Sequence, residues 1–528
     1  MLLIQNLSYA HSNKDLLFSQ LNLALHTQEK VALVGNNGSG KSTLLKLMAG
    51  LLPATDGSIS SSAQIYYVPQ LFTPYHELNI AQALGLEERL QALYAILAGA
   101  VTETNLLLLN DDWGLEERCR EAFSYWDLGN IELTQPMNSL SGGQKTKVFL
   151  AGIMIHQPEI VLLDEPSNHL DENGRELLYQ LIRSSRAALV VVSHDRQLLN
   201  LLDTVHELDK RGITTYGGNY DFYSEQKQLE HQALRDDVRD KEKALRKARE
   251  VERDTAERRQ RLDARGKKKQ EKAGLPTISM NTLRNQAEKS TSKLKTVHTE
   301  KTHAISEELK NLRHELPDMD QMTFGFDHSA LHKGKILISA RNLRFGYDQH
   351  MLWKDTLNVE VLSGERIALR GSNGSGKTSL IRLMLGEAEP TSGTIKKTVG
   401  KIMYIDQEYS LINGKQQVYE QAERYNRQGL QEHEVKLRLA RFLFNKEDWD
   451  KPCDALSGGE KMRLILCCLT ISQQAPDMII LDEPTNNLDI RNLEILTKAI
   501  NSYEGTLIVV SHDARFLQDI GIERTIDL

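Results

Sequence analysis

The sequence is poor in cysteine and in long apolar segments. Among its 528 residues are four cysteines, Cys119, Cys453, Cys467 and Cys468, which are too few for a disulfide framework and match no zinc spacing. No apolar run approaches the roughly 20 residues that a membrane-spanning helix needs. Residues 1–7 lack the basic region, long apolar segment and cleavage site of a secretory signal, so we expect a first strand there. These absences predict a soluble protein of the reducing cytoplasm without a membrane partner.

The charge is unevenly distributed along the chain. The whole sequence carries −7, but between Ser224 and Glu315 there are 24 lysines and arginines against 17 acidic residues, or +7, which leaves −14 for the remainder. Such asymmetry suits contact with a polyanion, but it is equally typical of a solvated helix face.

The length of the chain predicts two to four domains.

A glycine-rich loop, residues 35–42, follows the apolar run 31–34 and precedes a helical pattern. Strand, loop and helix in this order are typical of a phosphate-binding loop, where backbone N–H groups and the helix N-terminus face an anion. Lys41 can reach the β- and γ-phosphates of a nucleotide, and Ser42 can hold Mg²⁺. The predicted nucleotide contacts are Gly35, Asn36, Asn37, Gly38, Ser39, Gly40, Lys41, Ser42 and Thr43.

Four further motifs follow this loop. Gln70 ends a predicted strand, and a serine-glycine turn opens a helix with Ser141, Gly142 and Gly143. A buried strand ends at Asp164 and Glu165, and another ends before His194. Carboxylates at the carboxyl end of a buried strand lie where α/β sheets place their ligands. Asp164 suits Mg²⁺ coordination, and Glu165 suits a general base or a residue that positions water.

The whole set of motifs recurs in the second half of the chain. Glu483 and His512 each lie 318 positions after Glu165 and His194. The first copy has about 21 extra residues between Leu71 and Asn138. Such an internal repeat predicts two similar domains. The second set comprises Gly371, Ser372, Asn373, Gly374, Ser375, Gly376, Lys377, Thr378, Ser379, Gln407, Ser457, Gly458, Gly459, Asp482, Glu483 and His512.

This order of motifs resembles the ATP-binding domain of ABC ATPases. The resemblance implies an α/β fold with two P-loop ABC ATPase domains, residues 1–220 and 334–528, joined by an α-helical hairpin linker, residues 221–333. It also implies that each ATP lies between the phosphate loop of one domain and the serine-glycine turn of the other. Lys41 would then share ATP with Ser457, and Lys377 with Ser141, within a monomer.

The resemblance also implies roles for the site residues. Glu165 and Glu483 would orient the attacking water, with His194 and His512 stabilising charge on the transferring group. We expect both sites to hydrolyse ATP, although one of them could serve only to bind it. Tyr347 is the expected adenine contact of the second site, whereas the first must use Tyr9 or His11. The expected Mg²⁺ ligands are Ser42, Thr378, Gln70, Gln407, Asp164 and Asp482.

The linker between the two domains indicates which family of ABC ATPases the sequence resembles. Residues 221 to about 261 predict a long charged helix, residues 265–276 a break with a basic tip, and 281 to about 312 a return helix. With tandem ABC domains, this linker resembles the ABC-F family. Its members bind the ribosome near the tRNA exit site in the ATP-bound form, so the implied partners are rRNA and tRNA. We expect Lys267, Lys268 and Lys269 to contact RNA phosphates, because the tip lacks aromatic residues for base stacking.

Other assignments remain open on sequence alone. The hairpin could be a simple coiled-coil spacer. The ATPase pair of a sugar importer also has two copies, but it normally needs no basic hairpin of about this length. A DNA-repair ABC ATPase would carry its coiled coil within one domain. Within the ABC-F family, a general translation factor and an antibiotic-protection protein are both compatible with this hairpin.

Overall fold

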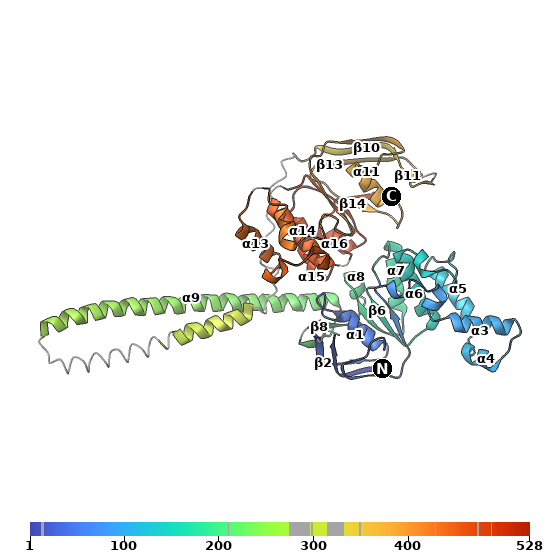
Figure 1. Cartoon of the computed structure of the whole chain (residues 1–528), viewed down its shortest axis with the longest axis horizontal. Helices are drawn as coiled ribbons and strands as arrows, with labels where there is room; N and C mark the ends of the chain where they lie inside the picture. The colour runs from blue at the N-terminus through green and yellow to red at the C-terminus, as the bar shows by residue number, and fades with distance from the viewer. Residues whose placement is uncertain are drawn as a thin grey trace. The chain divides into compact units, whose positions relative to one another are not determined.

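The computed structural model describes residues 1–528 except 12–14, 210, 274–295, 297–298, 314–331, 348–349, 428, 473–474 and 487. The chain divides into two compact units, one formed by Met1–Asp221 with Met322–Leu528 and the other by Phe222–Gln321. The first unit contains two α/β domains of the same design (Figure 1). The expected α/β fold class is confirmed.

A mainly parallel sheet carries the first domain. Its strands lie in the order β5 (Ile65–Val68), β6 (Ile160–Asp164), β7 (Ala188–Val192), β3 (Lys30–Val34), β8 (Thr204–Asp209) and β9 (Gly212–Tyr216). The first five run parallel, and β9 is antiparallel to β8. Every residue of β6 and β7 is buried, which explains why these strands have unbroken apolar sequences.

A second, antiparallel sheet in this domain has the order β2 (Leu16–Leu25), β1 (Leu2–Ala10), β4 (Asp56–Ser61). Its apolar side chains share one core cluster with β3, β6, β7 and the helix α1 (Lys41–Met48). The first strand, expected within residues 1–7, extends to Ala10. The phosphate loop therefore starts from the central sheet and ends in a helix whose apolar face is buried.

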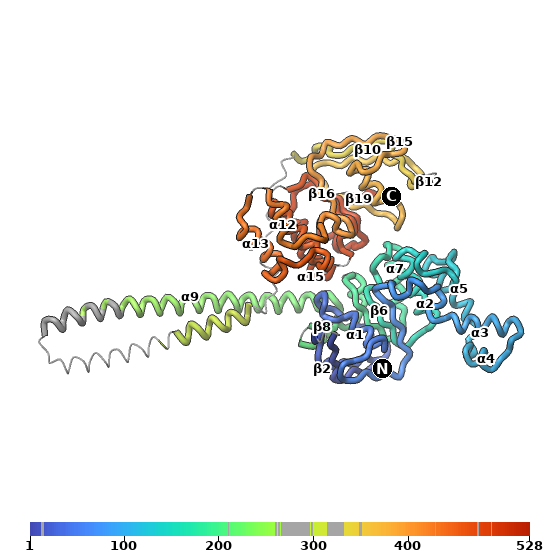
Figure 2. The backbone as a smooth tube through the Cα atoms, in the orientation of Figure 1, coloured from blue at the N-terminus to red at the C-terminus, as the bar shows by residue number. Residues whose placement is uncertain are grey.

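The remaining helices of the first domain include the predicted extra segment. Figure 2 shows α3 (Glu87–Leu97) and α4 (Glu103–Leu109) next to each other in the chain trace, and Leu93, Ile96 and Leu109 form a small cluster of buried side chains there. The second domain has no helix pair at this position among its described residues. The helices of the first domain after α1 are α2 (Ile80–Ala83), α3 (Glu87–Leu97), α4 (Glu103–Leu109), α5 (Leu115–Tyr125), α6 (Gly142–His156), α7 (Glu172–Ser184) and α8 (Arg196–Leu199), with short 3-10 turns at Thr73–Tyr75 and Met137–Ser139.

The second domain repeats this design. Its parallel sheet has the order β16 (Ile402–Ile405), β17 (Met478–Asp482), β18 (Thr506–Val510), β14 (Arg366–Arg370), β19 (Arg524–Asp527). Its antiparallel sheet has the order β13 (Leu357–Leu362), β10 (Ile336–Arg344), β15 (Ser392–Lys397), and β11 (Gly346–Tyr347) pairs with β12 (His350–Met351). The helices are α11 (Lys377–Leu385), α12 (Val418–Glu423), α13 (Glu432–Arg441), α14 (Gly458–Ser472), α15 (Ile490–Ser502) and α16 (Ala514–Asp519), with 3-10 turns at Lys446–Asp448 and Cys453–Ala455.

The other compact unit is built on one long helix. Helix α9 runs from Tyr220 to Ala273, and residues 299–313 form a return helix that lies beside it. The predicted break at Arg265 is wrong, because α9 continues through Gly266. A single glycine costs a helix only about 1 kcal/mol, and the surrounding Lys, Arg, Glu, Gln and Ala favour helix. No described helix combines the length and the apolar sequence needed to cross a membrane.

Candidate nucleotide sites

The two phosphate loops have the same backbone geometry. Residues 35–40 connect β3 to α1, and residues 371–376 connect β14 to α11. Gly40 and Gly376 precede these helices with φ of 98° and 96°, which side chains rarely allow. A Cβ on Gly40 would come within 2.7 Å of Leu17 Cδ2. Glycine is therefore required where each loop enters its helix.

The lysines of both loops fold back onto their own loop. Lys41 Nζ donates to the carbonyls of Gly35 at 2.8 Å and Asn36 at 3.1 Å, and Lys377 Nζ bonds Gly371 and Ser372 in the same way at 2.8 and 3.0 Å. Burial lowers the pKa of both lysines, and Glu165 or Glu483 partly opposes this shift. Each ammonium group is thus held where a phosphate could replace the carbonyl oxygens as its partner.

The hydroxyl that ends each loop contacts the aspartate at the end of a buried strand. Ser42 Oγ donates to Asp164 Oδ1 at 2.9 Å, and Thr378 Oγ1 donates to Asp482 Oδ2 at 3.2 Å. Burial raises the pKa of both aspartates, against the effect of these hydrogen bonds. These oxygen atoms form a compact, hard set of donors at both sites.

Sequence reasoning missed one residue in each site. Tyr67 donates its hydroxyl to Asp164 Oδ2 at 3.1 Å, and Tyr404 donates to Asp482 Oδ2 at 3.0 Å. Both tyrosines lie three residues before the predicted glutamine. The spacing to Gln70 and Gln407 is identical in the two halves, and this repeat was the signal that could have identified them.

Strand register brings the two predicted glutamates to the two predicted histidines. Asp164 pairs with Val192 across β6 and β7, so Glu165 lies beside the segment that carries His194. His194 Nε2 is 3.2 Å from Glu165 Oε1, and His512 Nε2 is 3.3 Å from Glu483 Oε1. Burial raises the pKa of Glu165 to about 8 and that of Glu483 to about 7, and it lowers the pKa of both histidines to about 4.

The backbone at both glutamates is unusual for residues with a side chain. Glu165 has φ of 51° and Glu483 has φ of 50°. Their backbone N–H groups donate to the carbonyls of Val192 and Val510, each at 2.8 Å. Non-glycine residues in this region store strain and often mark functional sites. The hydrogen bonds to Val192 and Val510 help to keep this strained backbone in place at the end of each strand.

Both serine-glycine turns cap a helix, but their hydrogen bonds differ. Ser141 Oγ accepts from the N–H of Gln144, whose amide oxygen in turn accepts from the N–H of Ser141 at 2.9 Å. In the second domain, Glu460 Oε2 accepts both the N–H of Ser457 at 2.8 Å and its hydroxyl at 2.7 Å. The second turn therefore presents a carboxylate at the start of α14.

The second phosphate loop and the first domain's serine-glycine turn line one cavity of about 510 Å³. Its walls come from both domains and include most of the predicted second-site residues. The predicted residues among them are Ser141, Gly142, Gly143, Tyr347, Asn373, Gly374, Gly376, Lys377, Thr378, Ser379, Gln407, Asp482, Glu483 and His512. We call this composite cavity the second site, and the region around Lys41 and Glu165 the first site.

Hydrogen bonds join each phosphate loop to the other domain. Asn373 Nδ2 donates to the carbonyl of His169 at 3.3 Å, and the N–H of Asn37 donates to Asp489 Oδ2 at 3.4 Å. Among the described residues, no hydrogen bond or ion pair joins Ser457, Gly458 or Gly459 to the loop of Lys41, so that pairing stays a prediction. Gln70 follows β5 at the first site and is half-buried.

The candidate adenine contacts differ between the sites. Tyr347 is 53% exposed on the wall of the second site, and its hydroxyl is 3.3 Å from Ser379 Oγ. Its ring packs edge-on against Phe345, just as His11 packs against Tyr9. Tyr9 also packs against the domain core, whereas His11 is exposed. Of the two candidates for the first site, His11 is thus the accessible counterpart of Tyr347.

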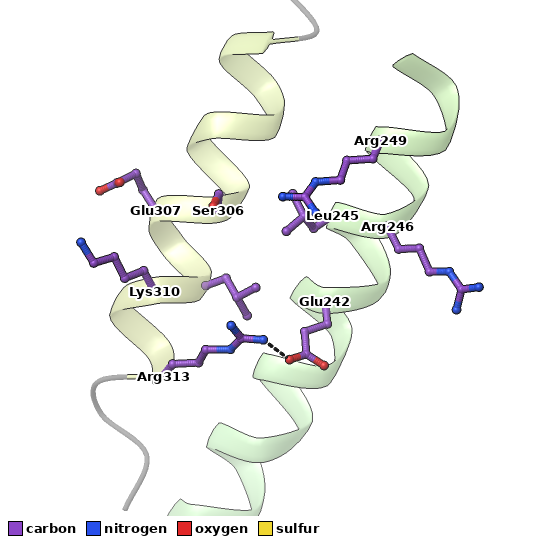
Figure 3. Close-up of a pocket in the computed structure, with 9 residues that line it drawn as sticks. Glu242, Leu245, Arg246, Arg249, Ser306, Glu307, Lys310 and Arg313 are labelled. Atoms are coloured by element: carbon purple, nitrogen blue, oxygen red, sulfur yellow. Dashed lines mark hydrogen bonds and ion pairs between the residues drawn. The ribbon is translucent and has the colours of Figure 1, made fainter. Parts of the chain in front are cut away.

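The described part of the hairpin has its own basic pocket. Figure 3 shows Arg249 extending from α9 toward the return helix, while Arg246 and Lys310 extend outward. Arg313 Nη2 donates to Glu242 Oε1 at 2.5 Å across the two helices. Lys267, Lys268 and Lys269 lie on the helical backbone of α9, and their side chains are outside the described residues.

Comparison with known proteins places these sites in a family. A family model described as ABC transporter matches residues 18–168 and 355–486. The uncharacterized ABC transporter ATP-binding protein YfmR of Bacillus subtilis is 31% identical, with 98% of this chain and 79% of that protein covered. The energy-dependent translational throttle protein EttA of Mycobacterium tuberculosis is 29% identical, with 96% of this chain and 88% of that protein covered.

A solved structure shares the fold over both halves. The archaeal ribosome recycling factor aABCE1, in complex with the archaeal ribosomal stalk protein aP1, matches 99% of this chain and 87% of its own length. The TM-score is 0.61 and the identity 20%. Two matched ABC domains in one chain, together with relatives aligned over nearly its whole length, agree with the geometry of the two sites. The chain therefore belongs to the ABC-F family of ABC ATPases, and its ABC domains bind and hydrolyse ATP.

Proposed function

We propose that this ATPase binds the ribosome near the tRNA exit site in an ATP-bound, closed form, and that hydrolysis releases it. The observation that carries the proposal is the charged helical hairpin, encoded between two complete ABC domains. The name of EttA describes a translational throttle, and aABCE1 is described as a ribosome recycling factor. These names support a ribosomal partner, and the contacts that we propose are with its rRNA and with bound tRNA. A cytoplasmic location follows from such a partner.

We further propose that ATP binds with Mg²⁺ at both sites. The hydroxyl and carboxylate pairs Ser42–Asp164 and Thr378–Asp482 supply the oxygen ligands that Mg²⁺ prefers, with Gln70 and Gln407 as further ligands. Bound Mg²⁺ would neutralise charge on the β- and γ-phosphates. The buried hydroxyls of Ser39 and Ser375 have no hydrogen-bond partner among the described residues, which fits loops shaped for a polar ligand.

The proposed mechanism uses residues of this chain in pairs. Lys41 and Lys377 would exchange their loop carbonyls for phosphate oxygens. Glu165 and Glu483 would orient the attacking water, and the neighbouring His194 and His512 would donate to the transferring phosphate. Ser457 would complete the first site, and Ser141 the second. Closure of the two domains on ATP is then required before either site is complete.

RNA contact by the hairpin is also proposed. Because α9 includes residues 267–269, the backbone of the three lysines lies on a helix instead of at a turn. The expected basic tip is therefore helical up to Ala273, and RNA contact has to be supported by other observations. What supports it is the excess of positive charge along the hairpin and the basic pocket that includes Arg246, Arg249 and Lys310.

Cosedimentation with ribosomes across a salt series tests the RNA contact. The Glu165→Gln, Glu483→Gln protein would hold ATP, and Lys267, Lys268 and Lys269 would all be changed to Glu in that background. Each phosphate contact contributes about 0.7 to 0.9 to the slope of log affinity against log salt. Losing three contacts should weaken binding and flatten the slope by about 2 to 3.

A matched control keeps the change in net charge constant. Lys335, Lys396 and Lys446 are exposed on the second ABC domain, and changing all three to Glu should leave the slope nearly unchanged. If the hairpin and control variants lose the same affinity and slope, general charge attraction explains binding. If neither the hairpin variant nor its parent sediments with ribosomes, a transporter ATPase or DNA-repair role becomes the better explanation.

A further inference from the structure

Arg175 is a buried cation that the proposed chemistry does not use. It lies in the first turn of α7, and its side chain is only 10% exposed. Its Nη1 donates to Asp195 Oδ2 at 3.4 Å, and its Nε donates to the carbonyl of Leu170 at 3.3 Å. A buried guanidinium needs such partners, because an unpaired charge in the protein interior is costly. Arg175 thus connects the segment 168–171 to the residue that follows His194.

The segment that Arg175 holds belongs to the second site. His169, Leu170 and Arg175 line the composite cavity together with Glu483 and His512 of the second domain. The carbonyl of His169 accepts the hydrogen bond from Asn373 of the second phosphate loop. Arg175 therefore anchors, through Leu170, the one segment of the first domain that makes this bond to the loop of Lys377.

The corresponding position of the second domain has no charge. With the offset of 318 residues that relates Glu165 to Glu483, Arg175 corresponds to Leu493, which is buried. The contact from the second domain to the first phosphate loop is made instead by the Asp489 carboxylate, which accepts from the N–H of Asn37. The two sites are therefore built differently, although their sequence motifs match.

The centre of this region also carries like charges from both domains. Asp195 and Asp513 follow the two predicted histidines. Burial is the main cause of the raised pKa of Asp513, and repulsion from Asp195 raises it further. The positive charges of Arg175 and Arg196 oppose this repulsion. Asp195 is held independently of Arg175, since Tyr179 OH donates to its Oδ2 at 2.5 Å and two backbone N–H groups of α8 donate to its Oδ1.

We propose that Arg175 is a positioning residue for ATP turnover at the second site, acting from the first domain through the segment 168–171. The proposal rests on the proposed roles of Glu165 and Glu483. Without Arg175, Leu170 loses this donor and the contact with Asn373 loosens. Asp195 keeps its other partners, so the first site is affected far less. ATP turnover at the second site consequently depends on Arg175, whereas the corresponding position for the first site is the uncharged Leu493.

Single-site ATPase measurements test this proposal. In the Glu165→Gln background turnover comes from the second site, and in the Glu483→Gln background it comes from the first. Arg175→Leu, which introduces the residue found at position 493, should lower kcat at least tenfold at the second site and less than twofold at the first. KM for ATP should change less than threefold in both. Arg175→Lys should recover part of the second-site kcat, because it restores a cation.

The control is Arg183→Leu, which removes an exposed arginine from the same helix and should change neither site. If Arg175→Leu does not fold, Arg175→Gln and Arg175→Lys provide the same comparison, with the glutamine variant impaired only at the second site. Equal losses in both backgrounds, or full second-site activity, would overturn the proposal. Persistent hydrolysis in the Glu165→Gln, Glu483→Gln protein would overturn the glutamate roles and the proposal with them.

Discussion

At the scale of single residues, burial decides the protonation of the glutamates in the nucleotide-free protein. Glu165 and Glu483 are buried beside a second carboxylate, Asp164 or Asp482, and both effects favour the neutral form. The neighbouring histidines are buried and have a lowered pKa, so they are neutral at pH 7. At pH 7 burial thus keeps Glu165 largely neutral, whereas Glu483, with a pKa of about 7, is about half ionised.

The raised pKa of Glu165 predicts a pH-dependent stability. A carboxyl with a folded-state pKa above its unfolded value adds stability below the unfolded value, near 4.5, and this stability is lost as pH rises through about 8. Glu165→Gln cannot ionise and should gain about 1 to 3 kcal/mol relative to the natural protein between pH 6 and 9. Thermal melting without nucleotide should show the gain as a growing difference in Tm.

Glu172→Gln is the control for this measurement, because Glu172 is exposed on α7 and close to the same site in sequence. Its Tm relative to the natural protein should stay constant over the same pH range. A constant difference for Glu165→Gln as well would show that Glu165 is already ionised at pH 6.

Tyr67 and Tyr404 are predicted to act through the aspartates that they contact. Partners that orient a metal ligand typically affect metal affinity or activity by 10- to 100-fold. Tyr67→Phe removes only the hydroxyl, so we expect the Mg²⁺ concentration for half-maximal ATPase activity to rise on the order of tenfold at the first site. The measurement uses Glu483→Gln as the background, with Tyr404→Phe as the control, which should leave the first site unchanged. An unchanged Mg²⁺ requirement in the Tyr67→Phe protein would remove Tyr67 from the metal site.

At the scale of helices and strands, sequence was informative wherever chemistry fixes the residue type. The phosphate loops, the carboxylates at strand ends and the second copy could be predicted because glycine, lysine and acidic residues are needed at set spacings. Tyr67 meets no such requirement, because many residues can occupy a strand position before a loop, and only its recurrence as Tyr404 could have identified it. The break at Arg265 was a wrong inference from one glycine, because the helical preference of a long charged run outweighs it.

The different caps of α6 and α14 lead to a prediction for ATP affinity. Glu460 places a carboxylate at the N-terminus of α14, where Ser457 is proposed to meet the γ-phosphate. Glu460→Gln would give the cap that Gln144 provides in the first domain. A charge at a helix terminus contributes about 0.3 to 1 kcal/mol, so ATP should bind the first site about two- to fivefold more tightly. Titration of a fluorescent ATP analogue into the Lys377→Ala protein measures this.

The opposite substitution in the first domain tests the same effect of the carboxylate on ATP affinity at the second site. Gln144→Glu introduces the carboxylate into the first domain, and it should weaken binding at the second site by a similar factor, measured in the Lys41→Ala background. Weaker binding by the Glu460→Gln protein would mean that helix capping by the carboxylate outweighs repulsion of phosphate.

At the scale of the whole molecule, the two ABC domains meet through polar contacts. Arg196 of α8 pairs with Asp519 at 3.2 Å, and Arg515 of α16 pairs with Asp221 at 2.8 Å, next to the start of α9. Polar interfaces between domains generally permit relative motion. In the proposed function, ATP bound between phosphate loop and serine-glycine turn would supply the free energy for closure.

The central claim is that ATP binding promotes ribosome binding and that hydrolysis ends it. Cosedimentation of the Glu165→Gln, Glu483→Gln protein with ribosomes, in ATP and in ADP at one salt concentration, tests it most directly. We predict that the variant sediments with ribosomes in ATP and stays in the supernatant in ADP, with the natural protein bound only weakly in either nucleotide. Equal sedimentation in ATP and ADP, or no ribosome binding at all, would contradict the account.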